Sequence, residues 1–207
     1  MPAQSQSAPE GWTIAQAAFL LGEPLDAFKK AVERSPVKPR MVRRAGLKVR
    51  YFAFHDLVYL RAVDELRGWI GRESRPAFYE AMTRTRLEEI DVIAFGPMTV
   101  KVRPYVTYIQ LKTRELGALA AKIDESGGDA LIKGTTIEAH RIASLLDGGM
   151  TVDQVLADYP SLTEAQVLAA KAYADANPKP GRPYPGQTAK AALRNADLKR
   201  LGEFLDS

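Results

Sequence analysis

Few residues of this 207-residue chain are of the types that carry out catalysis. The sequence contains no cysteine, which excludes disulfides, thiol nucleophiles and zinc sites built on thiolates. Its two histidines, His55 and His140, each stand near the start of a predicted helix without a second metal ligand at a suitable spacing. We therefore interpret both histidines as structural residues, and we expect no metal site and no cofactor.

Paired carboxylates do not supply a catalytic constellation either. Acidic neighbours occur at Glu88-Glu89 and Asp124-Glu125, but adjacent residues of a helix do not share a face. The sequence contains no glycine-rich phosphate loop and no recognisable serine nucleophile motif. We expect a protein that is not an enzyme, and we rank an uncharacterised enzyme below the binding functions considered next.

The strongest signal for binding is a run of cations. The stretch from Arg34 to Arg50 is rich in Lys and Arg and has no acidic residue. On a hairpin, such cations reach phosphates and release counterions from DNA, whereas a solvated loop is the alternative interpretation. The residues that we expect to contact DNA are Lys29, Lys30, Lys38, Arg40, Arg43, Arg44, Lys48 and Arg50.

The elements that position these cations form a helix-turn-helix pattern. Thr13 and Gln16 predict a capping box at the start of a first helix, Gly22 ends it, and a second helix follows within a few residues. Residues 41–53 predict a hairpin that turns at Ala45-Gly46. A third helix is expected from about His55, with a buried side that reaches Trp69.

Two of these segments resemble a known family. Residues 12–22 and 49–57 are similar to the N-terminal winged helix of MerR-like and excisionase-like regulators. The resemblance implies that the second helix, with Lys29 and Lys30, enters the major groove and that the wing contacts the backbone or the minor groove. No long dimerisation coiled coil follows.

The middle of the chain predicts mixed structure. Residues 98–103 alternate as a strand, residues 105–111 are expected to continue it, and residues 113–124 are expected to be helical. Strand-forming segments without an obvious internal partner tend to pair across chains. We therefore expect a homodimer, or a hetero-oligomer, with an interface in this region.

A small helical module is predicted from about residue 126. Thr151 with Gln154 and Thr163 with Gln166 predict two further capping boxes. The last helix is expected to bury one face, formed by Ala165, Leu168, Ala169, Ala172, Tyr173 and Ala176. Residues 131–137, 145–152, 155–163 and 167–174 resemble a small bacterial domain-of-unknown-function family whose members resemble VapB-type antitoxins. The chain has Thr136 where that family usually has Arg.

The C-terminal segment is predicted to be a tail. Residues 177–187 contain four prolines, which favours an extended linker, and residues 188–205 carry two apolar stripes in place of a single buried face. The resemblance implies that such a tail covers the metal cleft of a PIN-like ribonuclease. The residues expected to bind that toxin are Arg182, Tyr184, Leu193, Arg194, Leu198, Lys199, Arg200, Leu201, Phe204 and Leu205. The alternatives are a tail folded back on its own domain and a disordered tail.

The charge layout fits two different partners. Residues 1–70 have a net charge of +4, residues 131–178 of −3 and residues 179–207 of +3. No apolar run is long enough to span a membrane, and the N-terminus lacks a secretory pattern, so a cytoplasmic protein is expected.

These observations predict an α+β, mainly α protein. We expect an antitoxin of a type II toxin–antitoxin pair that binds operator DNA through its head and a PIN-like ribonuclease toxin through its tail. The alternative is a stand-alone winged-helix regulator with a ligand-sensing or oligomerisation module. The expected regions are an arm (1–11), a winged helix-turn-helix (12–72), a connecting region (73–125), the antitoxin-family module (126–178) and the toxin-binding tail (179–207).

Overall fold

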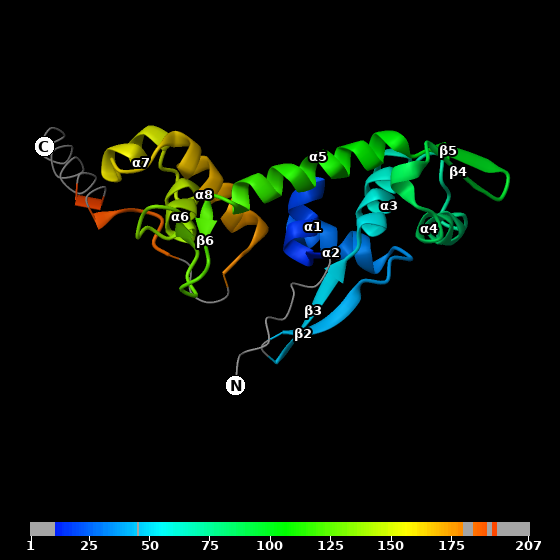
Figure 1. The fold of residues 1–207 in the computed structure, drawn as a ribbon, viewed down its shortest axis with the longest axis horizontal. Coiled ribbons are helices and arrows are strands. Elements are labelled where there is room, and N and C mark those ends of the chain that lie inside the picture. Colours follow the sequence, from blue (N-terminus) through cyan, green and yellow to red (C-terminus); the bar gives the residue numbers. More distant parts are fainter. Residues whose placement is uncertain (1–10, 45, 180–183, 190–191, 194–207) are drawn as a thin grey trace, which may run out of the picture. The chain divides into compact units, whose positions relative to one another are not determined.

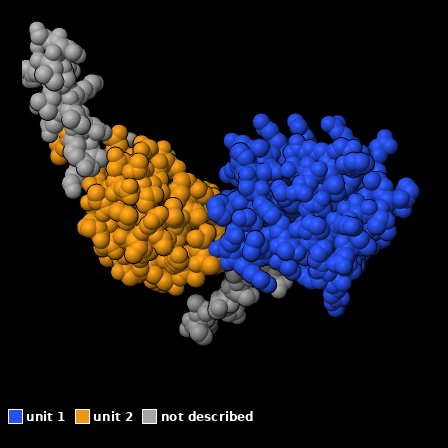
Figure 2. All heavy atoms as spheres, turned by 90° about the horizontal axis from the view of Figure 1, so that it is seen from above, with its two compact units in different colours: residues 1–115 blue, residues 116–207 orange. Residues whose placement is uncertain are grey.

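The computed structural model describes residues 11–44, 46–179, 184–189 and 192–193, and it confirms an α+β fold that is mainly helical. The chain divides into two compact units, residues 1–115 and residues 116–207, which we describe separately (Figure 2). No helix in the described ranges is both long enough and apolar enough to cross a membrane.

The first unit begins with two helices and a hairpin. Strand β1 (Trp12–Thr13) leads into α1 (Ile14–Leu21), where the capping box of Thr13 and Gln16 is confirmed. Gly22 ends α1 in the left-handed conformation, with a φ of 70°, and α2 (Leu25–Glu33) follows directly. Strands β2 (Arg40–Arg44) and β3 (Leu47–Phe52) form the predicted hairpin, in which Gly46 has a φ of 81°. The sheet order is β1-β3-β2, all antiparallel.

A small aromatic core holds these elements together. The rings of Phe28 in α2 and Phe52 in β3 lie 5.5 Å apart and are both buried. Helix α3 (Phe54–Glu65) follows the hairpin and packs on α1 and on α4 (Arg75–Thr83), where Tyr59 contacts Phe78. The hairpin is therefore mounted on a packed helical base (Figure 1).

One expectation for this unit is wrong, and the basis of another is removed. Helix α3 ends at Glu65, so Trp69 lies beyond it and is 80% exposed, while Ile70 is buried in its place. The connecting region contains a short 3₁₀ turn, η1 (Leu87–Glu89), and the strands β4 (Val92–Phe95) and β5 (Met98–Lys101), which pair with each other. Because these strands have an internal partner, the reason for expecting a dimer interface there is removed.

Residues 105–111 are helical, which corrects the expected strand. Helix α5 (Arg103–Ala120) covers them and begins with Pro104 in its first turn, a position that proline favours. Val102, Val106 and Ile109 are buried at spacings of four and three residues, which is helical periodicity. The β-branched and aromatic residues of this segment masked that period.

The second unit is a helical module with a short hairpin. Strands β6 (Ile123–Asp124) and β7 (Leu131–Ile132) pair, and they are followed by α6 (Ala139–Asp147), α7 (Val152–Asp158) and α8 (Glu164–Ala176). Both predicted capping boxes are present, at Thr151 and at Thr163. The core lies between α6, α7 and α8 and includes Ile142 and Leu145.

The buried face of α8 matches the predicted face in part. Ala169, Tyr173 and Ala176 are buried as predicted, whereas Ala165 and Leu168 are exposed. Val167, Ala170 and Ala174 are buried as well. The alanine-rich sequence contains several possible stripes of small residues. Packing against α6, which the sequence pattern does not specify, selects among them.

Candidate nucleic-acid interface

The β2-β3 hairpin separates its side chains into two faces. Val42 lies opposite Val49 on the face that leads to the buried Tyr51, and both valines are partly buried. Because successive side chains of a strand alternate, the other face carries Met41, Arg43, Lys48 and Arg50. All four of these side chains are exposed, and three of them are cationic. One side of the hairpin is therefore a positively charged surface, which we call the cationic face.

The cationic face carries an unfavourable pair. Arg43 is the direct cross-strand partner of Lys48, and Arg50 faces Met41. Like charges placed directly opposite each other destabilise a sheet. Among the residues that the structure describes, no acidic side chain forms an ion pair with Arg43, Lys48 or Arg50. This arrangement is suited to an external anion.

The other predicted DNA contacts are distributed around this face. Arg40 and Arg44 lie on the opposite face of β2 and are exposed. Lys38 is exposed in the segment before β2. Lys29 forms an ion pair with Asp26 at 3.0 Å, so its charge is partly neutralised, whereas Lys30 is exposed on α2.

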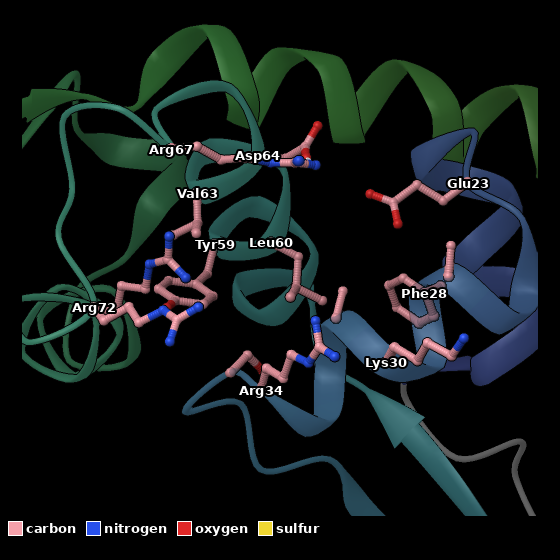
Figure 3. Close-up of a pocket in the computed structure, with 14 residues that line it drawn as sticks. Glu23, Phe28, Lys30, Arg34, Tyr59, Leu60, Val63, Asp64, Arg67 and Arg72 are labelled. Atoms are coloured by element: carbon pink, nitrogen blue, oxygen red, sulfur yellow. The ribbon is translucent and has the colours of Figure 1, made fainter.

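Lys30 lines a groove between α2 and α3. The groove has a volume of about 970 Å³, and its apolar wall includes Phe28, Leu60 and Val63. Figure 3 shows the Arg34 side chain reaching into the space between Phe28 and Leu60. Further cations line the groove, and these are Arg67 and Arg72 from the segment that joins α3 to α4 and Arg75 from the start of α4. Residues far apart in the sequence thus extend the positive surface beyond the hairpin.

Two polar atoms at the groove are unsatisfied. The Tyr59 hydroxyl and the Nε atom of Arg75 are buried and have no hydrogen-bond partner among the described residues. Burial raises the pKa of Tyr59 to about 12, so the phenol keeps its proton. Both atoms can donate a hydrogen bond, and none of the described residues offers them an acceptor.

Carboxylates confine the positive charge to one part of the groove. Glu23 and Asp64 line the groove as well, and Asp64 pairs with Arg67 (Figure 3). Partial burial raises the pKa of the Glu23 carboxyl, and Asp64 raises it further, whereas Arg67 and Arg61 oppose the shift. The net positive part is the one formed by Arg34, Arg72 and Arg75.

A buried carboxylate fixes the base of the hairpin. Asp56 is 2% exposed, accepts a hydrogen bond from the Ala53 N–H at 2.8 Å, and accepts another from the Tyr79 hydroxyl at 2.6 Å. Tyr79 in turn accepts a hydrogen bond from the Lys38 N–H at 3.4 Å. Burial and the bond to Asp56 raise the pKa of Tyr79. The segment before β2 is thereby tied to both α3 and α4.

Sequence reasoning missed the arginines of the groove. Arg72 and Arg75 were not predicted as site residues, because only the packing of α3 and α4 brings them to Arg34. The one local signal is the density of arginine between residues 67 and 75, next to the exposed Trp69.

Most of the predicted toxin-binding residues lie outside the described residues. This applies to Arg182, Arg194, Leu198, Lys199, Arg200, Leu201, Phe204 and Leu205. Leu193 is 67% exposed. Tyr184 lies on its own module, where its hydroxyl hydrogen-bonds the Glu138 carboxylate, and Lys179 lies over its ring at 5.6 Å from the centroid.

Within the described ranges, no three His, Cys, Asp or Glu side chains gather closely enough to hold a metal ion. His140 instead places Nε2 2.7 Å from the carbonyl oxygen of Asn177, which links α6 to the end of α8.

Comparison with known proteins identifies one part of the chain. Residues 124–174 match a family described as a protein of unknown function (DUF433). An uncharacterized protein from Sinorhizobium fredii, y4eO, is 27% identical over 89 residues, which are 41% of this chain and 40% of that protein. The chain thus covers less than half the length of this relative. No solved structure gives a significant match.

Proposed function

We propose that this protein binds double-stranded DNA through residues 12–75, acting as a winged helix. In this arrangement α2 presents Lys30 and Arg34 to the duplex, the β2-β3 hairpin is the wing, and the groove beside α3 receives backbone phosphates. The proposal makes the protein a DNA-binding regulator.

The cationic face of the hairpin is the observation that carries the proposal. Arg43 and Lys48 are cross-strand partners without an acidic neighbour, an arrangement that weakens the sheet unless an anion is bound. Phosphate is the anion that a row of exposed Arg and Lys side chains contacts in nucleic acids. The unpartnered donors at Tyr59 and Arg75 support the same ligand chemistry, because phosphate oxygens accept hydrogen bonds.

The test is binding of the full chain to duplex DNA from upstream of its own gene. Replacing Arg43 and Arg44 with Ala is expected to weaken binding about 10- to 100-fold at 0.1 M salt, from two lost phosphate contacts. The matched control replaces Arg84 and Arg86, which lie in the same unit but form ion pairs with Glu80 and Glu89. Equal losses in the two variants would contradict the proposal.

We further propose that this DNA-binding protein is the antitoxin of a type II toxin–antitoxin pair, which represses its own operon and neutralises a PIN-like ribonuclease. Support comes from the match of residues 124–174 to the DUF433 family, and from the net charge of +3 in residues 179–207, which suits an acidic metal cleft. The toxin-binding residues would be Arg182 and those of the tail from Leu193 onward, since the Tyr184 hydroxyl is bound to Glu138 of its own module.

Co-expression with the neighbouring reading frame tests this second proposal. Deletion of residues 189–207 is expected to abolish both the stable complex and the protection of cells from the nuclease, while DNA binding by the head is retained. A neighbour that is not a nuclease, or full protection by the shortened chain, would contradict it.

A further inference from the structure

A short extended segment of the chain lies on the second unit. Residues 184–188, which we call the strap, follow α8 and run along α6 (Figure 1). The Arg141 guanidinium donates to the carbonyl oxygens of Pro185, at 2.6 Å, and of Gln187, at 3.2 Å. Both acceptors belong to the main chain, so Arg141 recognises an extended backbone and not particular side chains.

Gly148 leaves room for this backbone. A Cβ atom on Gly148 would lie 2.1 Å from the carbonyl oxygen of Gly186, a distance that no structure tolerates. The φ of Gly148 is −77°, which any residue adopts. Glycine is therefore required at this position for space and not for backbone conformation, and the space is taken by the strap.

Both ends of the strap are held by carboxylates. Thr188 is 8% exposed, and its hydroxyl donates to Asp158 at 2.6 Å. Asp158 is the last residue of α7, where the helix dipole disfavours a carboxylate, and this hydrogen bond offsets that cost. At the other end the Tyr184 hydroxyl contacts Glu138, immediately before α6.

The residues that hold the strap belong to the family-matched region, whereas the strap does not. Glu138, Arg141, Gly148 and Asp158 all lie within residues 124–174. The buried core of the module is formed by residues between Ile123 and Tyr173, without any residue of the strap. The strap therefore binds to the surface of a module whose hydrophobic core is complete without it.

We propose that α6 and the end of α7 form a docking site for an extended peptide, and that the strap of this chain is its occupant. The site recognises the main-chain carbonyls of Pro185 and Gln187 and the hydroxyl of Thr188, and it leaves little room for any residue but glycine at position 186. This inference does not depend on DNA binding or on a toxin.

The test separates the strap from its site within the full-length chain. Replacing Gly186 and Thr188 with Val removes the glycine and the hydroxyl and is expected to empty the site. A fluorescent peptide with the sequence of residues 182–192 should then bind, as measured by anisotropy. Binding to the unaltered chain should be at least about tenfold weaker, because its own strap has an effective concentration of about millimolar. Absence of peptide binding to the emptied chain, or equal binding to both, would overturn the proposal.

Further substitutions in the emptied chain define the site. Gly148→Ala is expected to abolish peptide binding, whereas Gly127→Ala, which meets no atom within 4 Å, should leave it unchanged. If Gly148→Ala lowers the melting temperature of the module, Arg141→Gln gives the second measurement, with Arg114→Gln as its control. Peptide binding that survives both Gly148→Ala and Arg141→Gln would show that the peptide lies elsewhere and would refute the docking site.

Discussion

The hairpin of the first unit and the helical module of the second use the same cationic residue types in opposite ways. In the module, Lys171 pairs with Asp147 and Asp175, Lys179 pairs with Asp129 and Glu138, and Arg141 donates to two carbonyl oxygens. On the cationic face of the hairpin, the described residues provide no such acceptor for Arg43, Lys48 or Arg50.

This difference separates cations that stabilise the fold through intramolecular contacts from cations that are available to bind an external anion. Net charge alone does not make the distinction, because a paired lysine and an unpaired one count equally. The stability of the module is expected to come from its own packing. The hairpin is expected to be less stable than a hairpin without the like-charge pair of Arg43 and Lys48, because these cations serve to bind an anion.

The largest expected effect is on the packing of the module. Leu145 is fully buried in its core, so Leu145→Ala should lower the free energy of unfolding by about 3–5 kcal/mol, whereas Leu168→Ala, at a side chain that is 50% exposed, should have little effect. Thermal or urea unfolding measures both variants. Similar losses for the two leucines would show that the packing of α8 differs from the structure described.

A smaller effect of opposite sign is expected in the hairpin. Arg43→Thr removes the like-charge pair with Lys48 and should raise the free energy of unfolding of the first unit by about 0.2–1 kcal/mol, while it weakens DNA binding. Lys101→Thr on β5, opposite Val92, changes a strand lysine without such a pair and is the control. If Arg43→Thr destabilised the fold, Arg43 would be a structural residue.

The smallest effect concerns pH. The pKa of Glu23 is raised above its ordinary value of 4.5 in the folded state. The folded state therefore loses stability as the pH rises from that ordinary value through the raised one, because the carboxyl must then ionise in a less favourable environment. Glu23→Gln should therefore stabilise the first unit at pH 7, by about 0.5 kcal/mol or less, and the difference should vanish below pH 4. Unfolding at both pH values measures it, and a gain that is equal at both would mean that ionisation is not its cause.

The local features of the fold were predictable from the sequence, and the long-range features were not. The capping boxes at Thr13, Thr151 and Thr163 and the turn at Gly46 follow from residues within three positions of each other. The second half of helix α5, residues 113–120, was predicted, but its first half was missed because the β-branched and aromatic residues there imitate a strand, although Pro104 suits the start of a helix.

The candidate sites show the same limit. The cations of the hairpin stand out as a continuous run, and the register places Arg43 beside Lys48. The contribution of Arg72 and Arg75 to the groove, and the contacts of Arg141 and Asp158 with the strap, join residues 30 or more positions apart. No local pattern encodes these contacts, because they arise only when separate segments of the chain pack together.

The salt dependence of DNA binding tests the central claim most directly, since the claim is that unpaired cations of the first unit contact phosphates. The affinity of the full chain for its upstream duplex should fall steeply between 0.05 and 0.3 M salt, and Arg43→Ala with Arg44→Ala should flatten the log–log slope by about two, at about 0.9 per phosphate contact. A slope near zero, or one that these substitutions leave unchanged, would contradict the account.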